Sequence, residues 1–142
     1  MTAAFIAAVV DTLLPGDSGG PSGEPRLPPG SAAGIELGVL AKAHQALFDA
    51  IANQAGGVDA FITGDEPARV IFVQAVERAI PDAFRSLLSA LLADYYESSP
   101  VLVAMGWRTE PPQPQGHQLY FIHPAIKSAI YRVHNRGKLW RG

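Results

Sequence analysis

Two clusters of proline and glycine constrain this chain more than any other feature of its sequence. Residues 15–30 read PGDSGGPSGEPRLPPG and hold five prolines and five glycines. Proline lacks the backbone N–H that helices and central strands need, so neither element persists there. Such a segment forms either a long ordered loop or a flexible connection. Residues 107–122, WRTEPPQPQGHQLYFI, are the second long non-helical segment.

The composition is that of a globular protein. The 142 residues and 15.1 kDa suit a single domain over residues 1–142 that contains both loops. Hydrophobic residues make up 48% of the chain and charged residues 17%, which is too apolar for a disordered chain. No apolar run approaches the roughly 18–20 residues of a membrane-spanning helix. The absence of cysteine excludes disulfides, thiol nucleophiles and cysteine-ligated zinc or iron–sulfur clusters.

The apolar segment at residues 1–14 predicts a core helix. Its apolar side chains recur at helical spacing: Phe5, Ile6, Val9 and Leu13. We expect the helix to start near Thr2 and to end before Pro15. A secretory signal needs a positive leading region, but the first basic residue is Arg26. A cytoplasmic location is therefore expected.

A second helix is predicted from near Ser31 to the glycines at positions 56 and 57. Its apolar face comprises Ile35, Val39, Leu40, Ala43, Leu47, Phe48 and Ile51. Phe61 and Ile62 are then expected in a short, turn-rich link. Asp65, Glu66 and Pro67 are typical of a helix start, because an acceptor side chain precedes an acid and a proline in the first turn.

The third helix, begun at Asp65, should run to about Ile80, and Pro81 should open a fourth helix over residues 82–97. The fourth has the most regular apolar stripe, made by Phe84, Leu87, Leu88, Leu91, Leu92 and Tyr95. A short helical segment capped at residues 98–100 should end at Gly106. A final helix should start at residues 123–124 and run to about His134.

These elements predict a mainly α fold, a small helical bundle of about five helices with two long Pro/Gly-rich loops. A weak strand signal is confined to residues 118–122.

Charge is unevenly distributed along this chain. Residues 1–107 carry five basic and twelve acidic side chains, whereas residues 108–142 carry six basic and one acidic. The basic end either complements a partner or docks on the chain's own acidic surface.

A search for catalytic patterns finds none. The four histidines lack the spacing of three or four residues that favours metal binding on a helix: His44, His117, His123 and His134. The chain has no G-x-S-x-G motif and no phosphate-binding glycine loop. The sequence therefore predicts no catalytic, cofactor-binding or metal-binding residue in this chain. A small histidine-based enzyme remains an alternative, if His117 and His123 converge with an acid in space.

Aromatic, proline and arginine residues gather in the last third of the chain. Aromatics and arginines beside a stiff proline segment match the composition of protein–protein contacts. The predicted partner-contact residues are Tyr95, Tyr96, Trp107, Arg108, Pro112, Pro114, Arg136, Trp140 and Arg141. The alternative is that Trp107, Tyr120 and Phe121 fold back on the bundle as lids over its core.

Several segments resemble the gluconate 2-dehydrogenase subunit 3 family. They are residues 10–17 (VDTLLPGD), 94–97 (DYYE), 101–107 (VLVAMGW), 111–116 (PPQPQG) and 136–141 (RGKLWR). The resemblance implies a small helical accessory subunit of a membrane-associated or periplasmic sugar or sugar-acid dehydrogenase. It also implies a larger flavoprotein partner of the glucose–methanol–choline oxidoreductase type, which carries the FAD and the catalytic residues.

The resemblance predicts a non-catalytic subunit that forms a hetero-oligomer with this flavoprotein. The net charge of −2 gives no general case for nucleic-acid binding, so no nucleic-acid partner is expected. The export signal often found on such subunits is missing, which favours a cytoplasmic complex over a periplasmic one exported with its partner. The alternative from another class is a free-standing binding module, whose basic C-terminal tail takes nucleic acid or another anionic partner.

Overall fold

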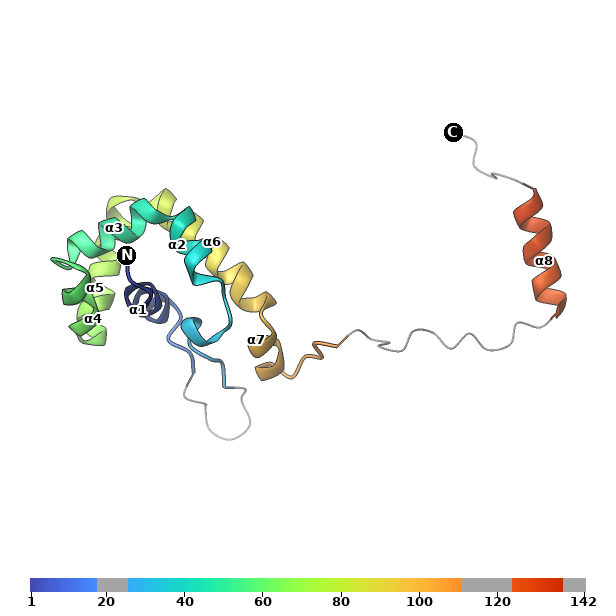
Figure 1. Cartoon of the computed structure of the whole chain (residues 1–142), viewed down its shortest axis with the longest axis horizontal. Coiled ribbons are helices and arrows are strands. Elements are labelled where there is room, and N and C mark those ends of the chain that lie inside the picture. The colour runs from blue at the N-terminus through green and yellow to red at the C-terminus, as the bar shows by residue number, and fades with distance from the viewer. Residues whose placement is uncertain (18–25, 111–123, 137–142) are drawn as a thin grey trace. The chain divides into compact units, whose positions relative to one another are not determined.

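The computed structural model describes residues 1–17, 26–110 and 124–136 (Figure 1). Over these ranges it contains eight α-helices, one short 3-10 helix and no strand. The mainly α fold predicted from the sequence is confirmed, with more and shorter helices than the five expected. The chain divides into two units, Met1–Thr109 and Glu110–Gly142. The single domain expected over residues 1–142 stays a prediction.

Helix α1 (Ala3–Leu13) forms where the apolar spacing predicts it. The Thr2 hydroxyl caps it by accepting a hydrogen bond from the Phe5 amide at 3.3 Å. Leu14 leaves the helical conformation just before Pro15, as expected. Phe5, Val9 and Val10 are fully buried, so α1 is a core helix.

The single helix predicted from Ser31 is wrong, because the chain forms three pieces. They are η1 (Gly30–Ala32), α2 (Leu37–Ala43) and α3 (Gln45–Gln54). Gly34 has a φ of +79°, a left-handed conformation through which a right-handed helix cannot continue. At His44 the backbone leaves the helical conformation again, with φ −117° and ψ 30°. The apolar periodicity runs across both breaks and so conceals them.

Residues Phe61 and Ile62, expected in a turn-rich link, instead belong to helix α4 (Val58–Thr63). A six-residue helix is unstable by itself, because helix nucleation is costly. Burial holds this one in place: Phe61 is fully buried and meets the Phe5 ring edge-to-face, with centroids 5.4 Å apart. A tertiary contact therefore overrides the local turn signal.

The next helices confirm their predictions closely. Helix α5 (Glu66–Ala79) is capped by the Asp65 carboxylate, which accepts a hydrogen bond from the Ala68 amide at 3.0 Å. Helix α6 (Pro81–Glu97) starts at its proline, and α7 (Ser99–Ala104) follows after Ser98. The α6 stripe is buried at Phe84, Leu87, Leu91 and Tyr95.

Helix α1 is the centre of the first unit and packs against η1, α2, α4 and α5 (Figure 1). Its Phe5 ring meets both Phe61 and Phe48, the latter at 6.3 Å between centroids. The main hydrophobic cluster joins α1 to the inner faces of α2–α6. One helix thus connects most of the bundle.

The described ends of the loop at residues 15–30 are held to α1 and to each other. The Asp11 carboxylate accepts two hydrogen bonds from Ser31, one from its amide and one from its hydroxyl, each 2.8 Å long. The Gly30 amide donates to the Leu14 carbonyl at 2.9 Å, and the Asp17 amide donates to the Leu27 carbonyl at 2.9 Å. The two ends therefore lie side by side, and residues 18–25 between them lie outside the described part.

The second unit contains α8 (Pro124–Asn135), which starts and ends close to its predicted bounds. None of its residues is buried. The described residues 107–110 are non-helical, as expected, whereas residues 111–123, with the weak strand signal at 118–122, lie outside the described part. No helix in the described ranges combines the length and the apolar character needed to cross a bilayer.

We predict that Asp11→Ala lowers the free energy of unfolding by about 1.5–3 kcal/mol, because it removes two hydrogen bonds to a carboxylate. Ser31→Ala removes only the hydroxyl bond and should cost less, about 0.5–1.5 kcal/mol. Denaturant titration followed by far-ultraviolet circular dichroism measures both values. Equal stability of Asp11→Ala and the unmodified chain would show that the loop ends are held by other contacts.

Candidate partner-binding surface

Three of the predicted partner-contact residues lie close to α7 in the chain: Tyr95 and Tyr96 at the end of α6, which turns directly into α7, and Trp107 just beyond the C-terminal end of α7. The Ser98 hydroxyl donates to the Tyr95 carbonyl at 2.7 Å, and the Leu102 amide donates to the Ser98 carbonyl at 3.0 Å. These bonds end α6 and start α7 within one residue. The corner between α6 and α7 is therefore a defined turn.

Tyr95 belongs to the core and not to the surface expected for it, because it is only 3% exposed. It forms a second hydrophobic cluster with Ala33 and Val101. Its hydroxyl donates a hydrogen bond to the Pro28 carbonyl at 2.7 Å, which ties α6 to the end of the 15–30 loop. Tyr95 is thus a buried residue that supports the corner between α6 and α7.

Burial also changes the acidity of Tyr95. Desolvation, assisted by the neighbouring Tyr96, raises the pKa of the Tyr95 phenol above its ordinary value of 10.0. The two rings meet edge-to-face, with centroids 5.3 Å apart and planes at 84°. Unlike Tyr95, Tyr96 is exposed and available to a partner.

Trp107 is held in place by the way α7 ends. The Trp107 amide donates to the Leu102 carbonyl at 2.8 Å, and the Gly106 amide donates to the Val103 carbonyl at 2.9 Å. Together with a φ of +74° at Gly106, this is a Schellman motif, which closes a helix through a left-handed residue. The backbone of Trp107 is therefore fixed, while its side chain is 64% exposed.

Two further apolar residues that precede Trp107 in the chain are exposed, and sequence reasoning missed both: Val103 and Met105. We call Val103, Met105 and Trp107 the α7 surface. A signal for it exists in the sequence. A six-residue helix that buries Val101 on one face directs Val103, two positions later, elsewhere. Arg108 follows directly and is also exposed.

An open depression of about 400 Å³ with an acidic rim also lies at the end of α6. Ile35 and the exposed Val39 contribute apolar surface to it, and Glu36, Asp94 and Glu97 contribute carboxylates. Among the described residues, no ion pair involves these carboxylates, since the Arg85–Asp82 pair at 3.0 Å lies elsewhere on α6. The depression therefore presents a single sign of charge. The residues that line it are Gly34, Ile35, Glu36, Val39, Asp94, Glu97 and Ser98.

The remaining predicted contact residues belong to the second unit. Arg136 is exposed just beyond α8, where its amide donates to the Val133 carbonyl at 3.2 Å. Pro112, Pro114, Trp140 and Arg141 lie outside the described residues. The alternative role of Trp107 as a core lid is wrong, because its side chain is mostly exposed. The same role for Tyr120 and Phe121 falls outside the described part.

The histidines are only partly described. His44 is half-buried between α2 and α3, and His134 is exposed on α8. His117 and His123 lie outside the described residues, so the histidine-based enzyme stays a hypothesis. In the ranges 1–17, 26–110 and 124–136, no three or more His, Asp or Glu side chains are grouped closely enough to hold a metal ion.

No family model, curated protein or solved structure matches this chain. A partner-binding role therefore stays a prediction from the residues themselves and from the resemblance of the short segments described above. The best-defined candidate is the exposed apolar α7 surface, on a short helix that starts just after Tyr95 and closes at Gly106.

We predict that the chain loses stability above pH 10. The unfolded chain releases the Tyr95 proton near its ordinary pKa of about 10, whereas the folded chain retains it to higher pH. The unfolded state then binds fewer protons, so the free energy of unfolding falls as pH rises. Below pH 10 this group contributes no pH dependence, because both states hold the proton.

Chemical denaturation at several pH values between 8 and 11.5 measures this effect. Tyr95→Phe, which cannot ionise, should show a flatter decline above about pH 10. Tyr96→Phe is the matched control, because it keeps the buried phenol and should retain most of the alkaline destabilisation. Identical slopes for the unmodified chain and Tyr95→Phe would contradict the assignment.

Proposed function

We propose that this chain is a non-catalytic accessory subunit, which binds and stabilises a larger FAD-dependent sugar or sugar-acid dehydrogenase or oxidase. In this proposal the FAD and the catalytic residues belong to the larger subunit. The small subunit supplies binding surface. A cytoplasmic location of the complex is part of the same proposal.

The observation that carries the proposal is the α7 surface. An exposed tryptophan on a fixed backbone loses little conformational entropy on binding, and tryptophan is among the residues that most often dominate interface energies. Val103 and Met105 are further exposed apolar residues of the same segment, and Arg108, the residue after Trp107, is an exposed cation. This composition is typical of a contact with another protein.

The resemblance of the sequence supports the class of partner. Residues 94–97 and 101–107, two of the segments similar to the gluconate 2-dehydrogenase subunit 3 family, coincide with the end of α6 and with α7. The segments that resemble an accessory subunit therefore include the α7 surface. A flavoprotein of the glucose–methanol–choline type is accordingly the partner that we propose.

Co-expression with a flavoprotein of the glucose–methanol–choline type from the same organism tests the proposal. We expect the two chains to co-elute in size-exclusion chromatography, with flavin absorbance only in fractions that contain the larger chain. We also expect that sugar oxidation needs the larger subunit. A well-folded monomer that oxidises sugars unaided, or that binds a stoichiometric flavin, would overturn the proposal.

We predict that Trp107→Ala weakens this complex about 30-fold or more, which corresponds to about 2 kcal/mol. Ile71→Ala on α5 is the matched control, because Ile71 is 62% exposed and Trp107 is 64% exposed. The free energy of unfolding of both variants should lie within about 0.5 kcal/mol of the value for the unmodified chain, as is usual for substitutions at surface positions. Titration calorimetry measures the affinities, and equal losses in the two variants would exclude a specific contact at α7.

A further inference from the structure

Helix α8 is amphipathic, and none of its residues is buried. An isolated helix of twelve residues is marginal in water, so most of its stability must come from packing of its apolar face. That face is exposed at Ile126, Ile130 and Val133. Some other surface must therefore cover α8 when it is stably folded.

We infer that α8 is a docking helix, whose apolar stripe seats in an apolar groove with an acidic rim on a protein partner. We define the α8 stripe as Ile126, Ala129, Ile130 and Val133. The inference rests on the proposed function, since the partner that it names is the larger flavoprotein subunit. It adds to that function a second contact, separate from the α7 surface.

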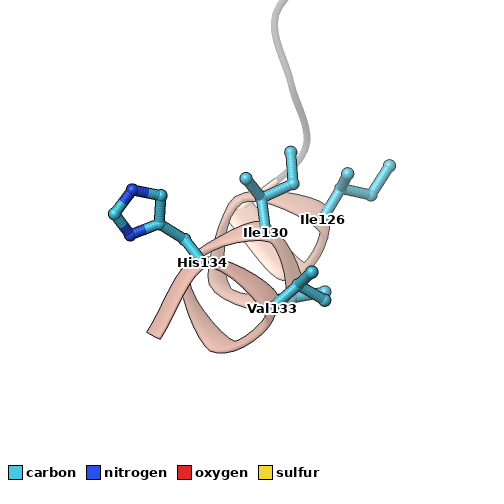
Figure 2. A pocket seen from close by; sticks show the side chains of 5 residues that line it. Ile126, Ile130, Val133 and His134 are labelled. Carbon is cyan, nitrogen blue, oxygen red and sulfur yellow. The ribbon is translucent and has the colours of Figure 1, made fainter. Parts of the chain in front are cut away.

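The spacing of the α8 stripe supports a groove. Its members follow the pattern i, i+3, i+4 and i+7, which is how a helix that lies in a hydrophobic groove places its anchors. Figure 2 shows Ile126, Ile130 and Val133 projecting from one side of the helix, with His134 at the edge of that side. The small Ala129 between the larger anchors lets the helix backbone approach the partner closely.

The cations of α8 indicate which charge the rim of the partner's groove should carry. Residues 124–136 contain Lys127, Arg132 and Arg136 and no Asp or Glu. At 100° per residue, Lys127 falls beyond the Ile130 edge of the α8 stripe and Arg132 falls beyond the Ala129 edge. A receptor with carboxylates on both sides of an apolar floor would complement these cations, which favours fast and oriented association.

The α8 stripe favours a protein over a membrane or a nucleic acid. Helices that lie on membrane surfaces place Trp, Phe or Leu on the apolar face, whereas this stripe holds only isoleucine, valine and alanine. The aromatic Tyr131 falls on the opposite side of the helix. Binding to nucleic acid phosphates would use the cations alone and leave the isoleucines exposed.

A second copy of the chain is the competing protein partner, because the acidic depression at Glu36, Asp94 and Glu97 offers similar chemistry. The larger subunit is favoured because a single partner then covers both the α8 stripe and the α7 surface. Self-association through the depression would account for the stripe and leave Trp107 uncovered.

The test compares Ile130→Asp with Tyr131→Asp in the full chain, using the co-expressed flavoprotein as the probe. The two positions are adjacent, and their side chains are 53% and 60% exposed. Each variant introduces the same charge and the same helix propensity, so only the face of α8 differs. We expect Ile130→Asp to raise the Kd at least about tenfold and Tyr131→Asp to change it less than about threefold.

The second arm of the test examines the role of the α8 cations and the alternative partners. Lys127→Gln combined with Arg132→Gln should slow association and flatten its dependence on salt. Sedimentation velocity of the chain alone measures self-association, and vesicles of phosphatidylcholine with phosphatidylglycerol measure binding to an anionic surface. We expect neither to depend on Ile130.

The outcomes separate the inference from the proposed function. If the unmodified chain binds the flavoprotein and both aspartate variants bind equally well, the docking role of α8 is wrong and the accessory-subunit role stands. If the unmodified chain does not bind the flavoprotein, both are overturned. Self-association or vesicle binding that is lost specifically in Ile130→Asp would assign α8 to a different partner and overturn the inference.

Discussion

The burial of α1 is the constraint on which the first unit depends. This helix lies among η1, α2, α4 and α5, so its side chains must pack against several elements at once. Phe5 contacts Phe48 on α3 and Phe61 on α4, which are separate elements brought together by one side chain. Gly30 shows how close the approach is, because a Cβ there would lie 2.5 Å from a Val10 methyl group. The short helices η1 and α4 exist because α1 provides a surface for them to cover.

Two polar contacts extend this order to the corner between α6 and α7. Asp11 on α1 holds Ser31, just beyond the loop at residues 15–30, and Tyr95 on α6 holds Pro28 within it. The described end of the loop is thus attached to the first helix and to the longest one. Because Tyr95 is also the neighbour of Val101 in the second cluster, the same attachment supports the start of α7. The helix that carries the α7 surface is therefore connected through these contacts to α1, at the centre of the first unit.

The local starts and stops of helices could be read from the sequence, whereas the effects of tertiary packing could not. Asp65, Pro81 and Gly106 act through their own backbone and caps, so the elements that they bound were predicted correctly. The break at His44 and the helix around Phe61 depend on what lies across the core, and periodicity alone does not report this. The candidate site divides in the same way. Trp107 was predicted because aromatic residues gather with prolines and arginines in the last third of the chain. Tyr95, predicted on the same ground, belongs to the core, and the exposed Val103 and Met105 were missed.

The two exposed apolar surfaces differ in what binding would require of them. The backbone of Trp107 is already fixed by the hydrogen bonds that close α7, so a partner gains its contact with little further ordering. Helix α8 has no buried residue to hold it, so part of the free energy of its docking must offset the ordering of the helix itself. A contact of this kind contributes less affinity for its area but responds more to salt, because its cations guide the encounter. A rigid anchor on the first unit and a charge-guided helix on the second would therefore act in sequence, with the helix favouring encounter and the tryptophan setting the lifetime of the complex.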